Sequence, residues 1–107
     1  MRLYNRDLLL AYKVFNKKLF SNRLPKDMPC RFVKMKGVLG QTHLDPQTWR
    51  PAYIAIASKL SGSHRVVWGT LIHEMVHVAN PTKRGHGPWF EKTMIDLAKR
   101  HAFRGLW

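Results

Sequence analysis

The chain has 107 residues, the size of one small domain, and we expect a single domain over 1–107. Apolar residues make up 45% of it, too many for a disordered segment, and its one cysteine, Cys30, excludes an intramolecular disulfide. Nineteen Lys and Arg against six acidic residues give a formal charge of +13, which favours a polyanionic partner such as nucleic acid. The apolar run near the N-terminus is too short for a signal peptide or a membrane span. We therefore expect a cytoplasmic protein, nucleoid-associated, or nuclear in a eukaryote, with no membrane partner.

Residues 5–20 are predicted to form an amphipathic helix. At 100° per residue one face is apolar, made by Tyr4, Leu8, Ala11, Tyr12, Phe15 and Leu19. A narrow basic stripe lies opposite, made by Arg2, Arg6, Lys13 and Lys17. We interpret this stripe as a candidate nucleic-acid contact, with an ordinary solvated helix face as the alternative.

Strands are predicted between Cys30 and about Ser58, after a proline-containing connection. Alternating and β-branched residues indicate three of them, in RFVKMK, VLGQTHL and YIAIAS. We expect these strands to form a small, mostly antiparallel sheet.

Two further helices follow the predicted strands. The first runs from about His64 to Ala79, with Ser61 or Ser63 as its N-cap, and it ends where Asn80 precedes a proline. The second begins near Pro88, because proline is well tolerated in the first turn of a helix. The predicted fold class is therefore α+β.

The helix at 64–79 carries four polar side chains among apolar ones: Thr70, His73, Glu74 and His77. They stand at i, i+3, i+4 and i+7, so we expect this face to line a cavity or a bound ion. Three of them form the motif HExxH, in which two imidazoles bind zinc and the carboxylate takes a proton from water. The composition predicts roughly 0.006 chance occurrences of the motif. The alternative is a pair of hydrogen-bonded core histidines beside an exposed glutamate.

A catalytic zinc ion usually has three protein ligands and one open position, so a third ligand is needed. The metzincin spacing is excluded, because asparagine and lysine stand where that pattern needs glycine and histidine. We favour His86, since the glycines on both sides of it allow a close approach to the metal. Glu91 in the last helix is the rival. The expected cofactor is one catalytic Zn²⁺, although imidazole ligands also suit other divalent metals.

These motifs resemble the SprT-like family, a zinc metallopeptidase-like domain also found in the Spartan proteases that degrade DNA–protein crosslinks. The similarity rests on LIHEMVHV (71–78), HGPWFEKTM (86–94) and, more weakly, VFNKKLFSNRLP (14–25). It covers nearly the whole chain and implies a zincin-like fold, with zinc ligands at His73, His77 and His86 and the catalytic glutamate at Glu74. The chain departs from the family in a short loop between the second and third histidines. It also lacks a cysteine-rich zinc ribbon, so DNA contacts would have to come from this domain's own Lys and Arg.

The favoured function is peptide-bond hydrolysis with Glu74 as general base. The expected substrate is a protein bound or crosslinked to DNA, with single-stranded or distorted DNA favoured over duplex, and the expected enzyme is a monomer. An extended substrate is expected to pair with a sheet edge formed by Tyr53, Ile54, Ala55 and Ile56. The residue that stabilises the oxyanion is left open among Tyr53, His43, His64 and His101. The alternative function is a basic nucleic-acid-binding module with a structural zinc and no proteolysis.

Overall fold

Three helices and a three-stranded sheet form the part of the chain that the computed structural model describes, which is residues 2–79 and 87–99. The elements are α1 (Asn5–Phe20), β1 (Cys30–Val33), β2 (Gly40–Leu44), β3 (Pro51–Ala57), a 3₁₀ turn (Ser58–Leu60), α2 (His64–Ala79) and α3 (Pro88–Lys99). The predicted α+β class is confirmed, and the three helices begin where the sequence pattern places them. Within the described ranges, no helix is both long enough and apolar enough to cross a bilayer.

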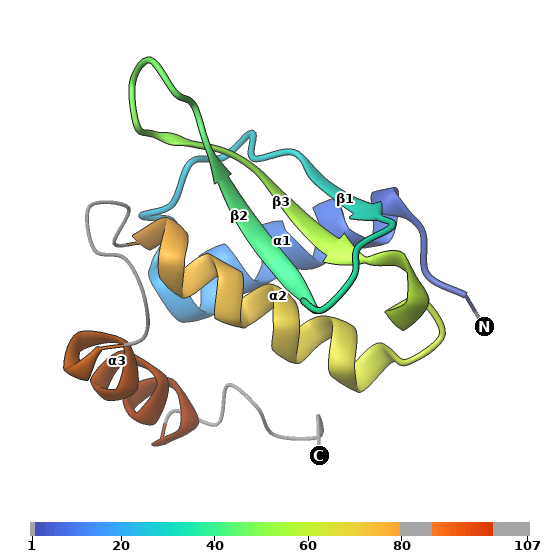
Figure 1. Cartoon of the computed structure of the whole chain (residues 1–107). Helices are drawn as coiled ribbons and strands as arrows, with labels where there is room; N and C mark the ends of the chain where they lie inside the picture. Colours follow the sequence, from blue (N-terminus) through green and yellow to red (C-terminus); the bar gives the residue numbers. More distant parts are fainter. Residues whose placement is uncertain (1, 80–86, 100–107) are drawn as a thin grey trace.

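The sheet is mixed rather than mostly antiparallel. Its strand order is β1-β3-β2, with β3 parallel to β1 and antiparallel to β2. The six residues between β1 and β2 therefore do not form a hairpin, and β3 enters between the two earlier strands (Figure 1). Ile54 to Ala57 are all buried in β3, the central strand, which has a neighbouring strand on each side.

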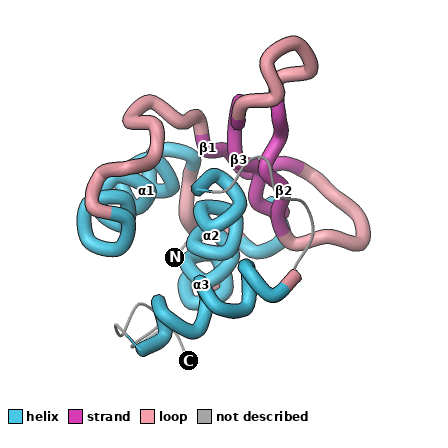
Figure 2. The backbone as a smooth tube through the Cα atoms, turned by 90° about the vertical axis from the view of Figure 1, so that its left-hand side faces the viewer, coloured by secondary structure: helices cyan, strands magenta, loops and turns pink. Residues whose placement is uncertain are grey.

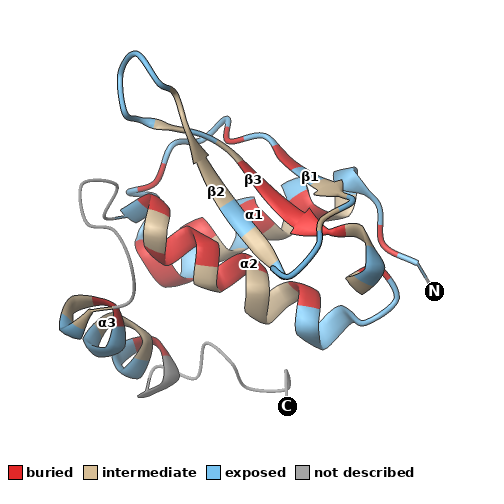
Figure 3. Ribbon diagram, viewed as in Figure 1, coloured by how far each residue is buried: buried red, intermediate tan, exposed pale blue. Residues whose placement is uncertain are grey.

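The helices pack on one face of the sheet in two layers. α1 contacts β1, α2 contacts β2 and β3, and the two helices also contact each other. α3 packs against α2 on the side away from the sheet, so α2 is the middle layer (Figures 1 and 2). Buried residues follow this arrangement, since they concentrate on α2 and β3 (Figure 3).

α1 is anchored by an apolar face and one buried amide. Leu8 and Tyr12 are fully buried as predicted, but Tyr4 is 55% exposed because it lies before the first helical residue. The Asn16 side chain accepts a hydrogen bond from Leu24 N–H and donates one to Leu24 C=O, both at 3.1 Å. These two bonds fix the connection that leads from α1 to the sheet.

Candidate functional site

α2 presents His73, Glu74 and His77 between the sheet and α3. The helix starts after Ser63, whose carbonyl accepts the Val67 N–H at 2.9 Å, and its other side is buried against the sheet and α1. The two imidazoles lie one turn apart, with ring centroids separated by 5.3 Å, and both are partly exposed. Glu74 is buried, with 5% of its surface exposed. The predicted polar face of this helix is therefore present.

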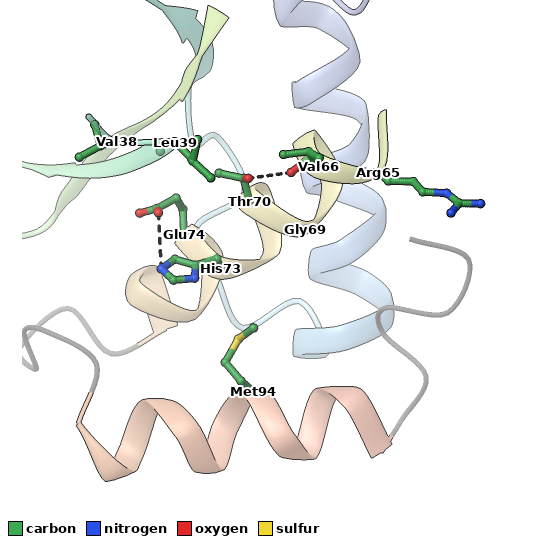
Figure 4. A pocket seen from close by; sticks show the side chains of 10 residues that line it. Val38, Leu39, Arg65, Val66, Gly69, Thr70, His73, Glu74 and Met94 are labelled. Atoms are coloured by element: carbon green, nitrogen blue, oxygen red, sulfur yellow. Dashed lines mark hydrogen bonds and ion pairs between the residues drawn. The ribbon is translucent and has the colours of Figure 1, made fainter. Parts of the chain in front are cut away.

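The Glu74 carboxylate accepts a hydrogen bond from Thr42 on one side and lies near His73 on the other. The Thr42 hydroxyl on β2 lies 2.9 Å from Glu74 Oε1, to which it donates a hydrogen bond. On the other side, His73 Nε2 lies 3.9 Å from Glu74 Oε2 (Figure 4). Burial raises the pKa of the Glu74 carboxyl above its usual range, while hydrogen bonding by Thr42 works against this shift.

Thr42 reaches Glu74 because Gly40 lets β2 lie close to α2. A Cβ atom on Gly40 would stand 2.7 Å from Thr70 Cγ2 and 3.3 Å from Glu74 Cγ, closer than side-chain atoms normally approach. Side chains two residues apart in a strand point to the same face, so Gly40 and Thr42 both face the helix. Reasoning from the sequence missed both residues. The available signal was a glycine two positions before a threonine in a short strand.

The first turn of α3 packs against the two histidines. The Phe90 ring centroid lies 4.8 Å from that of His73 and 4.9 Å from that of His77. Trp89 contacts the second imidazole edge-on at 6.0 Å. Phe90 is buried, so α3 covers the histidine pair with aromatic rings.

Two of the three predicted zinc ligands lie together. His86 lies outside the described residues, so the structure leaves this third ligand a prediction. Within the described residues no group of three potential ligands from His, Cys, Asp and Glu occurs. The rival ligand Glu91 lies in the described part of the chain and is exposed on α3. It does not form a group of three potential ligands with His73 and His77. The described donors therefore fit two positions of a zinc site.

A cavity of about 700 Å³ opens beside His73 and Glu74. His73 and Glu74 line one part of it, and the rest is formed by the segment that leads into β2, the first half of α2, and Met94 of α3 (Figure 4). The expectation that the polar face of α2 borders a cavity is thus confirmed.

The prediction that β3 forms a sheet edge is wrong. Tyr53, Ile54, Ala55 and Ile56 lie on the central strand, which pairs with β1 on one side and β2 on the other. A strand paired on both sides has no row of unpaired backbone groups to offer a peptide. The three residues after Tyr53 are also fully buried. The edge strand next to α2 is β2.

The described candidates for oxyanion stabilisation lie away from Glu74. Tyr53 and His43 stack on each other with ring centroids 4.3 Å apart. His43 follows Thr42, and successive strand side chains alternate, so this stack lies on the sheet face opposite the helices. His64 begins α2, ten residues before Glu74, which places it about 15 Å away along the helix axis. His101 lies outside the described residues.

The predicted basic stripe is exposed as expected, in Arg2, Arg6, Lys13 and Lys17. The Arg6 guanidinium lies over the Tyr4 ring at 5.5 Å from its centroid. This geometry leaves the stripe accessible, and nucleic-acid binding there remains a prediction.

The α+β fold and the histidine–glutamate face of α2 are compatible with a metallopeptidase-like domain. A family model described as the SprT-like family matches residues 9–104, and the chain belongs to that family. Comparisons with curated proteins and with solved structures give no match.

Proposed function

We propose that this protein is a zinc-dependent peptidase with Glu74 as its general base. The observation that carries the proposal is a buried carboxylate, held by Thr42, whose Oε2 lies 3.9 Å from His73 Nε2. Burying a carboxylate costs free energy, and this one lines an open cavity rather than pairing with a Lys or Arg among the described residues. Such a group is typical of a catalytic site. Membership of the SprT-like family supports the same reading.

His73 and His77 are the proposed zinc ligands on α2, and His86 is the proposed third. The first turn of α3 begins at Pro88, two residues after His86 in the sequence. Because Phe90 in that turn packs on both imidazoles, a ligand from the segment before α3 is favoured over Glu91, which is exposed. Three imidazoles would leave one metal position open to solvent and substrate.

The proposed chemistry divides between the metal and Glu74. His73, His77 and His86 would hold zinc, which would supply a Lewis acid for the scissile carbonyl and for the attacking water. The Glu74 carboxylate accepts the proton from the attacking water and later donates it to the leaving amine. Burial strengthens its affinity for the proton, whereas the Thr42 hydrogen bond stabilises the ionised form and fixes its direction. These opposite effects suit a group that must both take and return a proton.

The substrate strand is proposed to pair with β2. Ile54 donates its N–H to Pro29 on the β1 side, so the Ile54–Thr42 pair is not a hydrogen-bonded pair of the antiparallel ladder. The Thr42 N–H and C=O consequently face away from β3. A peptide that paired with the free edge of β2 would pass beside Glu74, because the Thr42 side chain on this strand is hydrogen-bonded to the Glu74 carboxylate.

The proposed substrate is a protein bound or crosslinked to DNA. Exposed basic residues lie on α1 and just before it, and the whole chain has a formal charge of +13. Each phosphate that they neutralise releases counterions, so many weak contacts add up to useful affinity. No residue of α1 lines the cavity beside Glu74. DNA held on α1 would therefore leave that cavity accessible to the attached protein.

The test compares cleavage of a basic DNA-binding protein by zinc-loaded wild type, Glu74→Gln and Glu91→Gln, with and without single-stranded DNA. Both substitutions remove one acidic group, but Glu91 is an exposed residue of α3 and serves as the matched control. We expect Glu74→Gln to bind zinc and to lose cleavage by at least about 100-fold, and Glu91→Gln to resemble wild type in both respects.

Equal cleavage by wild type and Glu74→Gln would remove Glu74 from the mechanism. A wild-type protein that binds zinc and DNA but cuts no protein would favour the nucleic-acid-binding module instead. Loss of zinc from Glu91→Gln would make that residue the third ligand in place of His86.

A further inference from the structure

The residues that the structure describes around the cavity beside Glu74 are mostly apolar. Val38 and Leu39 form one wall on the segment that leads into β2, and Val66 forms the opposite wall on α2. These side chains are 37%, 49% and 42% exposed, respectively. Single exposed apolar residues are common on proteins, but three that converge on one hollow indicate a place for an apolar ligand.

Thr70 contributes to the apolar wall despite its hydroxyl group. The hydroxyl donates a hydrogen bond to Val66 C=O at 2.6 Å, within the helix (Figure 4). Its Cγ2 methyl instead points toward Gly40, since that methyl is the atom closest to where a Gly40 Cβ would lie. The polar atom is thus satisfied inside α2, and the methyl faces β2.

The cavity extends to His73 and Glu74. Val66, Thr70 and His73 stand at i, i+4 and i+7 on α2, so they form one stripe along the helix. Val66 lies about 10 Å from His73 along the helix axis, which is long enough for one large side chain. The volume of about 700 Å³ lies within the range usual for ligand sites, about 300–1,000 Å³.

We propose that this cavity, bounded by Val38, Leu39, Val66 and Met94, binds a large apolar side chain of the substrate next to the scissile bond. The proposal rests on the peptidase function above and adds a preference for Leu, Met or Phe at one position. Arg65 also borders the cavity, but its side chain points away from Glu74 (Figure 4). An uncharged occupant therefore fits the described lining better than an acidic or basic one.

The first experiment maps the sequences that zinc-loaded protein cuts in a random peptide mixture, read by mass spectrometry. We expect one position beside the cut to favour Leu, Met and Phe over Gly and Asp by about tenfold or more. Val66→Asp is expected to abolish that preference, because it places a charge in the apolar wall. Val66→Phe, which narrows the cavity, is expected to shift the preference to smaller apolar side chains.

The substitutions at Val66 are chosen to preserve folding. Val66 is exposed in the first turn of α2, where an aspartate is favoured by the helix dipole. Val14→Asp is the matched control, since Val14 is 47% exposed on α1 and does not line the cavity. We expect this control to keep the wild-type preference. An absent apolar preference in wild type, or the same preference in Val66→Asp, would overturn the proposal.

A second experiment separates failure of the pocket from failure of the peptidase. The Glu74→Gln protein is titrated with peptides that differ only in a central Leu or Gly, and the ¹³C-methyl NMR signal of Met94 is followed. We expect the Leu peptide alone to shift this signal, and Val66→Asp, unlike Val14→Asp, to remove the response. If the Leu peptide shifts the signal in this way but wild type cuts no peptide, the proposed pocket is retained and the proposed peptidase function is rejected. Phospholipid vesicles are titrated as a second probe. An equal response to both peptides, or a response to the vesicles alone, would reject the proposed binding of an apolar side chain in this cavity.

Discussion

The Thr42 hydroxyl lies 2.9 Å from Glu74 Oε1 and 3.1 Å from the Glu74 carbonyl oxygen, although the two residues are 32 positions apart. This contact joins the edge strand β2 to the helix α2 at the carboxylate proposed as general base. The rotamer of Glu74 therefore depends on the packing of the sheet against the helix.

Replacing Thr42 by valine is expected to lower kcat and to leave zinc content and KM nearly unchanged. Valine keeps the shape of threonine but cannot donate to Glu74. A hydrogen bond to a charged group contributes about 1.5–3 kcal/mol, so kcat should fall by about 10- to 100-fold. Thr42→Ser, which retains the hydroxyl, should recover most of the activity in steady-state assays. Wild-type kcat in Thr42→Val would show that this bond does not position the base.

Gly40→Ala is expected to reduce the free energy of unfolding by about 1–3 kcal/mol, because its Cβ would meet Thr70 Cγ2 at 2.7 Å. Thr70→Ser removes that methyl and should restore part of the loss in the double variant. Gly62→Ala is the control, since nothing lies within 4 Å of a Cβ there. Urea unfolding is measured for wild type, Gly40→Ala, the double variant and Gly62→Ala. An equal effect of the two alanine substitutions would contradict the close approach of β2 to α2.

Stability is expected to fall with rising pH above about 8.5, the ordinary pKa of a thiol. Burial raises the pKa of the Cys30 thiol to about 12 in the folded protein. The folded state then holds a proton that the unfolded state releases, so stability is full below this range and declines by up to about 1.4 kcal/mol per pH unit above it. Urea unfolding between pH 7 and 10 should show a shallower decline for Cys30→Ala. Measurements stop at pH 10 because burial also raises the pKa of Tyr12 above its usual range.

The same pH slope in wild type and Cys30→Ala would mean that other groups cause the decline. Thiol labelling offers an independent check. The buried Cys30 should react with a thiol reagent at pH 8 only after urea is added.

Binding to single-stranded DNA is expected to depend on the basic stripe of α1. The test variant replaces four cations by glutamine, at Arg2, Arg6, Lys13 and Lys17. Each lost phosphate contact reduces the slope of log K against log salt by about 0.7, so the slope should fall by up to about 3. A control with the same charge change replaces four exposed lysines elsewhere, at Lys26, Lys34, Lys36 and Lys59. If both variants lose the same slope, the binding is unspecific and α1 is not the site.

The helices could be predicted from the sequence because their signals are local. The apolar period of α2, the serine before it and the Asn-Pro pair after it mark its two ends within a few residues. The HExxH motif is local as well, since helix geometry alone brings His73 and His77 to one face.

The strand order could not be read in the same way, because pairing joins residues that are distant in sequence. The uninterrupted apolar run from Ile54 to Ala57 favoured a central strand, whereas the mixed pattern of Gly40 to Leu44 favoured an edge. Taking the apolar run as the edge led to the wrong substrate strand. Thr42 was missed for a related reason, since no motif marks a threonine whose partner lies on a distant helix.

The proposed mechanism requires an open zinc site beside a Glu74 carboxylate that is not itself a zinc ligand. Zinc-edge X-ray absorption of wild-type protein and Glu74→Gln, each loaded with one equivalent of zinc, tests this directly. We expect three imidazole nitrogens at about 2.0–2.1 Å and one position occupied by solvent, with the same spectrum in both proteins. Four protein ligands, or a spectrum that changes when Glu74 is replaced, would contradict this mechanism.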